Sequence, residues 1–235
     1  TDATYDFVGT TDLQDLVFRT NDIEVGRFLT SGDLNITEGG RLTLGHRNGM
    51  SMDSANNIFI GEGSGGSNTS GMFNSTMGYR AGADNTTGNN NVFLGALSGR
   101  RNTDGVANLF IGSFSGFANT QGDRNTYIGY NSGRNSQGDD NVSIGYQAGE
   151  NNSAGSNNVN IGTRAGRYND GSNNVFIGNL ADAPTGVSGS IAIGNNASVT
   201  QNNSIVLGSI NNANVGIGTS APSATLDVVG TLQYT

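Results

Sequence analysis

Short apolar triplets recur along most of the chain, and each one ends in glycine. The segment 91–95 (NVFLG) is a representative copy, with close relatives at 108–112, 141–145 and 174–178. Triplets of this kind are too short and too rich in glycine to form helices. Their glycines recur at steps of 16 or 17 residues, shortening to 14 and then 10 at the end, at Gly45, Gly61, Gly78, Gly95, Gly112, Gly129, Gly145, Gly162, Gly178, Gly194, Gly208 and Gly218.

A second glycine follows the first after four residues, and the residue before it is always small. Gly99 after Ser98 and Gly149 after Ala148 are examples. Glycine permits a positive φ, so these positions are predicted corners of a coiled chain. The pattern therefore predicts an all-β fold: a parallel β-solenoid in which each 16–17-residue step forms one rung.

The alternation within each triplet predicts two faces, because the first and last side chains of a three-residue strand point the same way. The last position is aliphatic throughout the array. We expect this column to fill the interior of the coil as its structural core, which comprises Ile60, Leu94, Ile111, Ile128, Ile144, Ile161, Ile177 and Ile193.

The middle position of the triplet is often aromatic, and we expect it to face outward. Rungs stack about 4.8 Å apart, so such side chains would form a continuous ladder. Soluble monomers rarely leave an apolar surface of this kind in water. The ladder is therefore predicted to be an interface between subunits, unless neighbouring loops alone shield it, and its members are Phe59, Phe93, Phe110, Tyr127 and Phe176.

An asparagine precedes nearly every triplet. Asparagine tolerates a left-handed backbone, bonds to nearby backbone groups and can form stacked amide ladders. We prefer this structural interpretation to a ligand-binding one for Asn57, Asn74, Asn91, Asn108, Asn125, Asn141, Asn158, Asn174 and Asn214.

The repeat divides the chain into three parts. Residues 1–40 carry predicted strands at 5–9, 15–20 and 23–29 and are expected to form a small β-cap or connector. Solenoids need caps because a bare terminal rung exposes apolar surface and unpaired strand edges. The repeat array is predicted to span 41–218, and 219–235 is expected to be a β-connector to a following segment.

Composition narrows the possible partners. All 11 basic residues are arginine, and the net charge of −8 disfavours nucleic acid or an anionic membrane as partner. The chain has no cysteine, so it has no disulfide and no thiolate metal site. It shows neither a long apolar run nor an opening signal peptide, so we expect no membrane insertion by this segment. An exported protein would then be represented here by a fragment or a mature product.

Candidate catalytic and metal-binding residues are few. His46 is the only histidine, which gives neither a histidine metal site nor a catalytic triad. Asp123 and the pair 139–140 stand in rung turns, but the Gly-Gly-x-Gly-x-Asp pattern of calcium-binding repeats is missing. We interpret them as solvated turn carboxylates. The segment 63–67 is rich in glycine but lacks the lysine of a phosphate-binding loop.

Two pairs of arginines remain, 100–101 and Arg164 with Arg167. They either pair with neighbouring acids, which we prefer, or contact an anionic glycan. The sequence thus predicts no catalytic residue, no metal site and no cofactor, and it indicates a protein that is not an enzyme.

The segment 190–194 (SIAIG), with its return after 14 residues, resembles the head repeats of trimeric autotransporter adhesins of the YadA type. That resemblance implies a left-handed parallel β-roll with three chains side by side. Longer rungs such as 146–152 look like repeats in large secreted surface proteins of gliding Bacteroidetes-type bacteria and in phage tail fibres. The opening 7–21 also looks like that group, and 215–228 is similar to segments that precede a stalk or a chaperone domain in such fibres. Most rungs here have 16–17 residues instead of 14, so the geometry of the assembly can differ.

We therefore expect a non-enzymatic fibre or adhesin module, extracellular, on a cell surface or a virion fibre. Its expected partners are its own copies, most simply as a trimer, and a glycan or protein on a host or prey surface. Other symmetric assemblies stay open, as does the identity of the ligand. A spacer of a capture filament or tail fibre without its own ligand is the alternative. A polysaccharide-processing enzyme would need clustered carboxylates or bases on one face, and an ice-binding solenoid would need outward ranks of threonine; neither pattern is evident.

Overall fold

A computed structural model describes residues 16–20, 23–28, 34–35, 41–43, 49–52, 56–209 and 214–230, and these ranges contain strands and turns but no helix. The strands before the array are β1 (Leu16–Thr20), β2 (Ile23–Phe28), β3 (Leu34–Asn35), β4 (Arg41–Thr43) and β5 (Gly49–Met52). Those of the array are β6 (Ile58–Ile60), β7 (Ser75–Met77), β8 (Val92–Leu94), β9 (Leu109–Ile111), β10 (Thr126–Ile128), β11 (Val142–Ile144), β12 (Val159–Ile161), β13 (Val175–Ile177), β14 (Ile191–Ile193) and β15 (Ile205–Leu207). The chain continues with β16 (Val215–Ile217) and β17 (Leu226–Val228).

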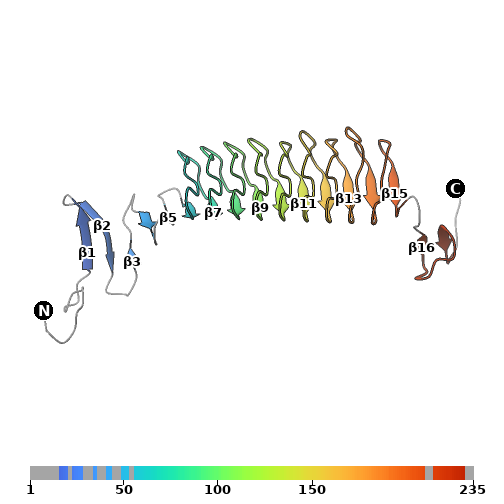
Figure 1. Ribbon diagram of the computed structural model, residues 1–235, viewed down its shortest axis with the longest axis horizontal. Helices are drawn as coiled ribbons and strands as arrows, with labels where there is room; N and C mark the ends of the chain where they lie inside the picture. Colours follow the sequence, from blue (N-terminus) through green and yellow to red (C-terminus); the bar gives the residue numbers. More distant parts are fainter. Residues whose placement is uncertain are drawn as a thin grey trace, which may run out of the picture.

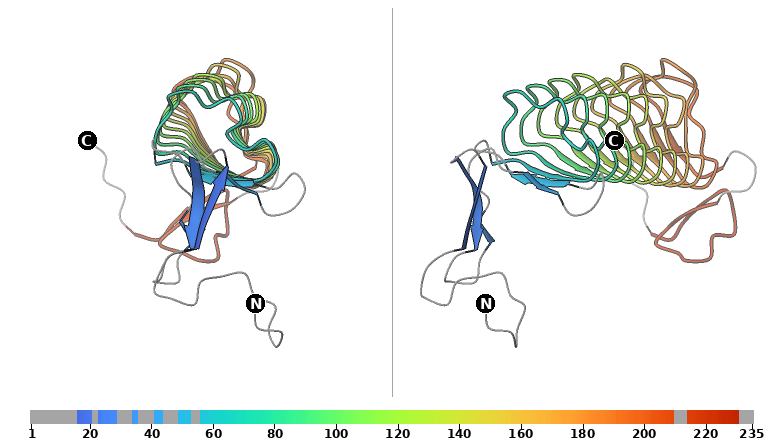
Figure 2. Two further views of the ribbon diagram at one scale, coloured as in Figure 1. Left: turned by 90° about the vertical axis from the view of Figure 1, so that its left-hand side faces the viewer. Right: turned by 60° about the vertical axis from the view of Figure 1, so that its left-hand side comes forward.

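The array is a parallel β-solenoid, as the glycine register predicts. Strands β6 to β15 follow one another in one sheet, each paired in parallel with the next. The pairing keeps equivalent residues opposite, so Phe93 faces Phe110 and Phe110 faces Tyr127. In Figure 1 the strands form a row along one side of the coil, and the loops lie along the opposite side. The end-on view in Figure 2 shows successive rungs lying over one another.

The ends of the array differ from the predicted bounds of 41 and 218. Strands β4 and β5 belong to the same sheet but run antiparallel, and β5 pairs with β6. At the other end β16 pairs only with β17, in a separate sheet. The parallel coil therefore extends from β6 to β15. The predicted strands at 15–20 and 23–29 correspond to the antiparallel pair β1 and β2, whereas 5–9 and His46 lie outside the described residues.

The two faces of the triplets are the reverse of the prediction. The middle side chains are buried inside the coil: Phe93, Phe110 and Tyr127 have no exposed surface, and Phe59 and Phe176 are also buried. The aliphatic column predicted as core points outward instead, and all of its members are half-buried or exposed, namely Ile60, Leu94, Ile111, Ile128, Ile144, Ile161, Ile177 and Ile193. The predicted subunit interface is thus the hydrophobic core of a single chain.

Ring stacking and the second glycine of each rung explain this arrangement. The rings of Phe93 and Phe110 lie 5.1 Å apart and those of Phe110 and Tyr127 4.9 Å apart, close to the spacing of the rungs. A Cβ atom on Gly99 would stand 2.7 Å from the Phe93 ring, so only glycine gives that ring room. In four of the five rungs with an aromatic middle residue, the glycine six residues later thus makes a narrow interior wide enough for the flat side chain. Phe176 is the exception, because Asp182 stands at that position and the space is left by Gly166 of the preceding rung.

The asparagine column is a structural ladder, as the sequence predicts. The Oδ1 atom of Asn91 accepts the backbone N–H of Asn108 at 2.9 Å, and its Nδ2 atom donates to the Gly105 carbonyl at 2.8 Å. Asn57 through Asn174 repeat both bonds, and all are buried. The left-handed position is the residue before each asparagine, such as Asn90 at φ 57°. Each amide thus joins its own rung to the next.

The inward position of the aromatic column predicts a large loss of stability for Phe110→Ala. Removing a buried Phe ring leaves a cavity and should lower the free energy of unfolding by about 3–5 kcal/mol. Phe73→Ala is the matched control, because Phe73 is exposed and should tolerate truncation with little change. Urea denaturation followed by circular dichroism measures both. Equal losses for the two variants would contradict the burial of the ring.

The amide ladder predicts that Asn91→Ala lowers the free energy of unfolding by about 1–3 kcal/mol, because it leaves the buried N–H of Asn108 unpaired. It also removes one of the two amides that donate to the Gly105 carbonyl, the other being that of Asn102. Asn179→Ala serves as control, since the exposed Asn179 amide bonds only to the side chain of Asn195. The same denaturation experiment compares them. If Asn91→Ala were as stable as Asn179→Ala, the ladder would not hold the rungs together.

Candidate functional site

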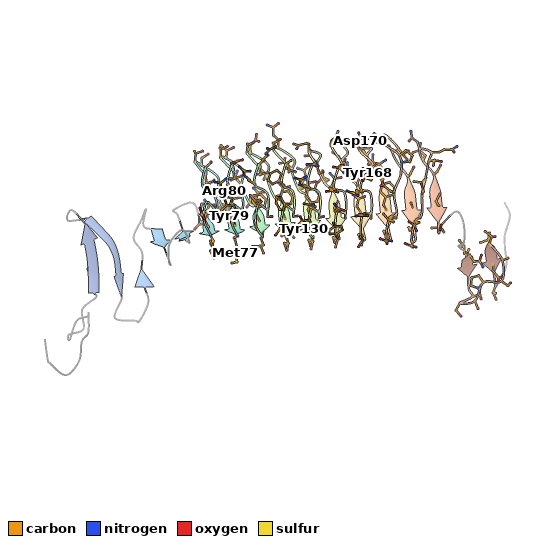
Figure 3. The ribbon with its side chains drawn as sticks, in the orientation of Figure 1. Met77, Tyr79, Arg80, Tyr130, Tyr168 and Asp170 are labelled. Carbon is orange, nitrogen blue, oxygen red and sulfur yellow. The ribbon has the colours of Figure 1, made fainter. Side chains whose placement is uncertain are left out.

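The outward side of the sheet is an extended apolar surface. We call it the outer sheet face; it consists of the first and third residues of β6 to β15. All of these except Ser75 and Thr126 are apolar, and none is fully buried. Ile144 is 36% exposed and Ile205 67% exposed. Figure 3 shows Met77 projecting away from the loop side, where Asp170 lies.

The size of the outer sheet face indicates an interaction surface. Nine steps of about 4.8 Å and strands of three residues give a flat strip about 43 Å long and 10 Å wide, on the order of 430 Å². Patches of this size in soluble proteins often serve recognition. A standard interface takes about 800 Å² from each partner, so the strip suits the apolar centre of an interface with a polar rim.

A second surface follows the strand ends, at the corner that begins with the first glycine of each rung. We call it the aromatic–arginine corner: Arg100, Arg101, Phe114, Phe117, Tyr130, Arg134 and Tyr146. The rings of Tyr130 and Tyr146 stack with centroids 5.8 Å apart. Both tyrosines are nearly half exposed, and Tyr130 is labelled just beyond the strand row in Figure 3. The edge of Phe114 packs against Tyr130 with the centroids 6.1 Å apart.

The arginines predicted from the sequence make two kinds of contact, with polar side chains or with an aromatic ring. Arg167 pairs with Glu150, its Nε atom 2.7 Å from the carboxylate, and Arg164 donates to the Gln147 side chain at 2.9 Å. The preferred pairing with an acid is therefore correct for Arg167. Arg100 and Arg101 instead lie over the Phe117 ring, at 5.9 and 5.2 Å from its centroid. Sequence reasoning named Arg100 and Arg101, with an anionic glycan as the less preferred contact, but it missed Arg134 and the aromatic residues of this corner. The recurrence of aromatic and arginine residues shortly after the rung glycines was a usable signal.

The turn carboxylates serve the coil itself. Asp123 accepts the backbone N–H of Val106 at 2.7 Å, and Asp139 accepts that of Asp123 at 2.9 Å. Asp140 forms a bidentate ion pair with Arg124 on the surface, and this guanidinium holds the pKa of the Asp140 carboxyl below its ordinary value. In the part of the chain that the structure describes, no group of three or more His, Cys, Asp or Glu residues is placed to hold a metal ion.

Comparison with protein-family models, with curated proteins and with solved structures gives no match for this chain. The resemblance to adhesin head repeats and fibre repeats therefore stays a prediction. Within the described ranges no helix has the length and apolar character needed to cross a membrane.

Burial raises the pKa of two side chains of the coil, Tyr127 and Asp182. The Tyr127 hydroxyl donates to Ser136 at 2.7 Å, and burial raises the pKa of this phenol well above its ordinary value, so it stays neutral. Burial also raises the pKa of the Asp182 carboxyl to about 6, although it accepts the N–H of Ala183 at 2.8 Å. Asp182 is thus an acid whose ionisation opposes folding.

Asp182 predicts a pH dependence of stability. An unfolded Asp titrates near 3.8, so between that pH and about 6 the folded chain holds the extra proton. The stability this group contributes is present at low pH and is lost as the pH rises through 6. Asp182→Asn stays neutral, so its stability relative to the parent chain should improve by up to about 3 kcal/mol between pH 4 and pH 8. Urea denaturation at both pH values measures this.

The exposed Asp104→Asn variant controls for the loss of one negative charge. It should show a much smaller change with pH than Asp182→Asn. A gain for Asp182→Asn that is the same at both pH values, or larger at pH 4, would contradict the raised pKa.

Proposed function

We propose that this chain is a non-enzymatic segment of an extracellular fibre, in which several copies pack their outer sheet faces together and attach a cell or particle to another surface. The observation that carries the proposal is the apolar strip along β6 to β15, in which the third residue of every strand is apolar. The hydrophobic effect favours removing such a strip from water. Copies of this chain are suitable occupants because the strip runs the full length of the coil, so coils lying side by side would cover all of it.

The narrow shape of the strip favours chains arranged around an axis parallel to the coil. In such a closed assembly every strip points to the axis, and the polar turns form the rim. Three chains, in left-handed β-rolls, remain the expected arrangement, consistent with the resemblance to the YadA type. The residues that we propose at the interface are now the aliphatic first and third positions of the triplets, such as Leu94 and Ile144, in place of the aromatic column.

The coil supplies stiffness, which a multivalent fibre needs. Every rung is tied to the next by backbone hydrogen bonds on its corners as well as in its strands, for example from Gly99 to Ser115 and from Arg101 to Phe117. Several copies held in one rigid body would bind a surface together and gain avidity over a single copy. A glycan or a protein on a host or prey surface is the proposed target.

A spacer without its own ligand is the second candidate, because many loop side chains serve the coil. The hydroxyls of Thr69, Thr86 and Thr103 each donate to a carbonyl of the following rung. Hydrogen bonds of this kind between rungs explain the polar loop residues without any ligand. Screening of the purified chain on arrays of glycans and surface proteins separates the two candidates, since a spacer should bind none of them.

The assembly is tested by Ile144→Glu, which places a charge in the middle of the outer sheet face. Sedimentation equilibrium of the parent chain should give a defined multiple of the chain mass of 24.1 kDa. The variant should weaken association on the order of 100-fold, because a buried unpaired charge costs about 3–5 kcal/mol. Ala154→Glu, on an exposed loop, is the matched control and should assemble normally. A monomeric parent chain would overturn the proposal.

A further inference from the structure

Three guanidinium groups surround one half-buried ring in the aromatic–arginine corner. Arg100 and Arg101 approach Phe117 from the preceding rung, and Arg134 approaches it from the following rung at 5.5 Å. Arg134 also lies 5.8 Å from the centroid of Phe114. The rings thus hold three positive charges together at one place on the coil.

These contacts leave the hydrogen-bonding capacity of the arginines unused. A cation–π contact engages the face of the guanidinium, whereas its five N–H donors lie in the plane. Among the described residues, no carboxylate lies within 4 Å of Arg100, Arg101 or Arg134. The Nε atom of Arg100 is buried and has no hydrogen-bond partner. Arg101 is exposed and Arg134 is half-buried, so these two guanidinium groups can present their unused donors to an anion from solvent.

Two acids are engaged elsewhere: Glu150 binds Arg167 and Gln147, and Asp104 accepts from Thr103 and Gln121. Asp84 lies one rung before Arg101, and its backbone N–H donates to the Arg100 carbonyl at 2.9 Å, but its carboxylate forms no ion pair with either arginine. The cluster is thus not neutralised by a direct ion pair, in a chain whose net charge is −8. A local positive centre on an acidic protein attracts a ligand with a few well-placed anionic groups more than a polyanion such as nucleic acid, which the remaining acids repel.

The backbone indicates that the aromatic residues here are not required by the coil. Phe114 has φ of 59°, a left-handed conformation that is costly for a bulky residue. The equivalent position of the first rung is Gly63, at φ 67°, so the turn itself accepts glycine. Leu97 and Asn131 have a positive φ at the same position of their rungs, so the turn sets this conformation and the coil does not require an aromatic side chain there.

The stacked pair of Tyr130 and Tyr146 extends the corner along the coil with a half-exposed aromatic surface made of the ring edges. Phe114 joins this pair to the arginine cluster, so rings and donors form one strip across four rungs. Exposed aromatic rings make apolar contacts with the C–H groups of sugars, and arginine forks bind carboxylate or sulfate in a bidentate manner. The two kinds of group together match one class of ligand.

We propose that the aromatic–arginine corner binds an acidic saccharide, with its carboxylate or sulfate groups held by Arg100, Arg101 and Arg134 and its sugar rings on Tyr130 and Tyr146. The proposal deepens the attachment function by naming the ligand class, and the site is complete within a single chain. Phosphopeptides and nucleic acids also carry anionic groups, but they lack the row of saccharide rings whose C–H groups the tyrosine pair would contact.

Binding of fluorescently labelled oligosaccharides to the full chain, followed by polarisation, tests the site. The probes are a heparin decasaccharide, an oligogalacturonate and a neutral dextran oligosaccharide of similar length; these separate sulfate from carboxylate as the anion. Arg101→Gln/Arg134→Gln should weaken binding of the charged probe at least about tenfold, since charge-assisted hydrogen bonds are lost. Tyr130→Ala should weaken it as well, and higher salt should weaken it for the parent chain.

The double variant Arg80→Gln/Arg124→Gln removes the same charge at two other exposed positions and should bind within about twofold of the parent chain. Equal losses for both double variants would overturn the site, as would binding of neither charged probe. Competition by inorganic sulfate alone, or by a single-stranded oligonucleotide, at the affinity of the saccharide would overturn the ligand class. If the chain assembles but binds neither charged probe, only the saccharide site is overturned. If a monomeric chain binds through these arginines, only the fibre proposal is overturned.

Discussion

The register of one rung over the next is the constraint on which the rest of the structure depends. Backbone hydrogen bonds between rungs fix it on the sheet and at the corners, and the buried amides of the asparagine column fix it between them. Each residue type is thereby multiplied into a column with a spacing of about 4.8 Å. A column repeats its chemistry along the coil, so a single position in the repeat determines a whole surface or a whole part of the core.

Because each position repeats as a column, the three positions of the strand have different roles. The middle position lies in the interior, where Phe93, Phe110 and Tyr127 form a stack at the rung spacing and the corner glycines leave room for their rings. The first and third positions form the outer sheet face, which a solitary coil leaves in water. Because the interior is only about one side chain wide, the chain cannot bury both sets of apolar residues by itself. The same geometry that builds the coil therefore creates the surface for its copies.

Much of the fold could be predicted from the sequence, because glycine spacing and strand alternation are local properties. The strands, the rungs and the amide ladder follow from these. The assignment of inside and outside could not be obtained in this way, since alternation in 91–95 defines two faces without saying which is enclosed. Gly99, six residues after Phe93, held that information, because its missing Cβ makes room for the ring. The aromatic–arginine corner as a whole was missed since it joins residues from different rungs, such as Arg100, Phe117 and Arg134.

Electron paramagnetic resonance on spin-labelled pairs tests the stacked coil most directly, with continuous-wave line broadening for the shorter separation and pulsed measurement for the longer one. The absence of cysteine in the chain allows labels at chosen sites. Thr87, Gln121 and Ala154 occupy one exposed loop column, with Gln121 two rungs and Ala154 four rungs beyond Thr87. With labelled chains diluted in unlabelled protein, the separation from Thr87 should be about 10 Å to Gln121 and about 19 Å to Ala154, with narrow distributions. Separations that do not grow with the number of rungs, or that are broadly distributed, would contradict the account.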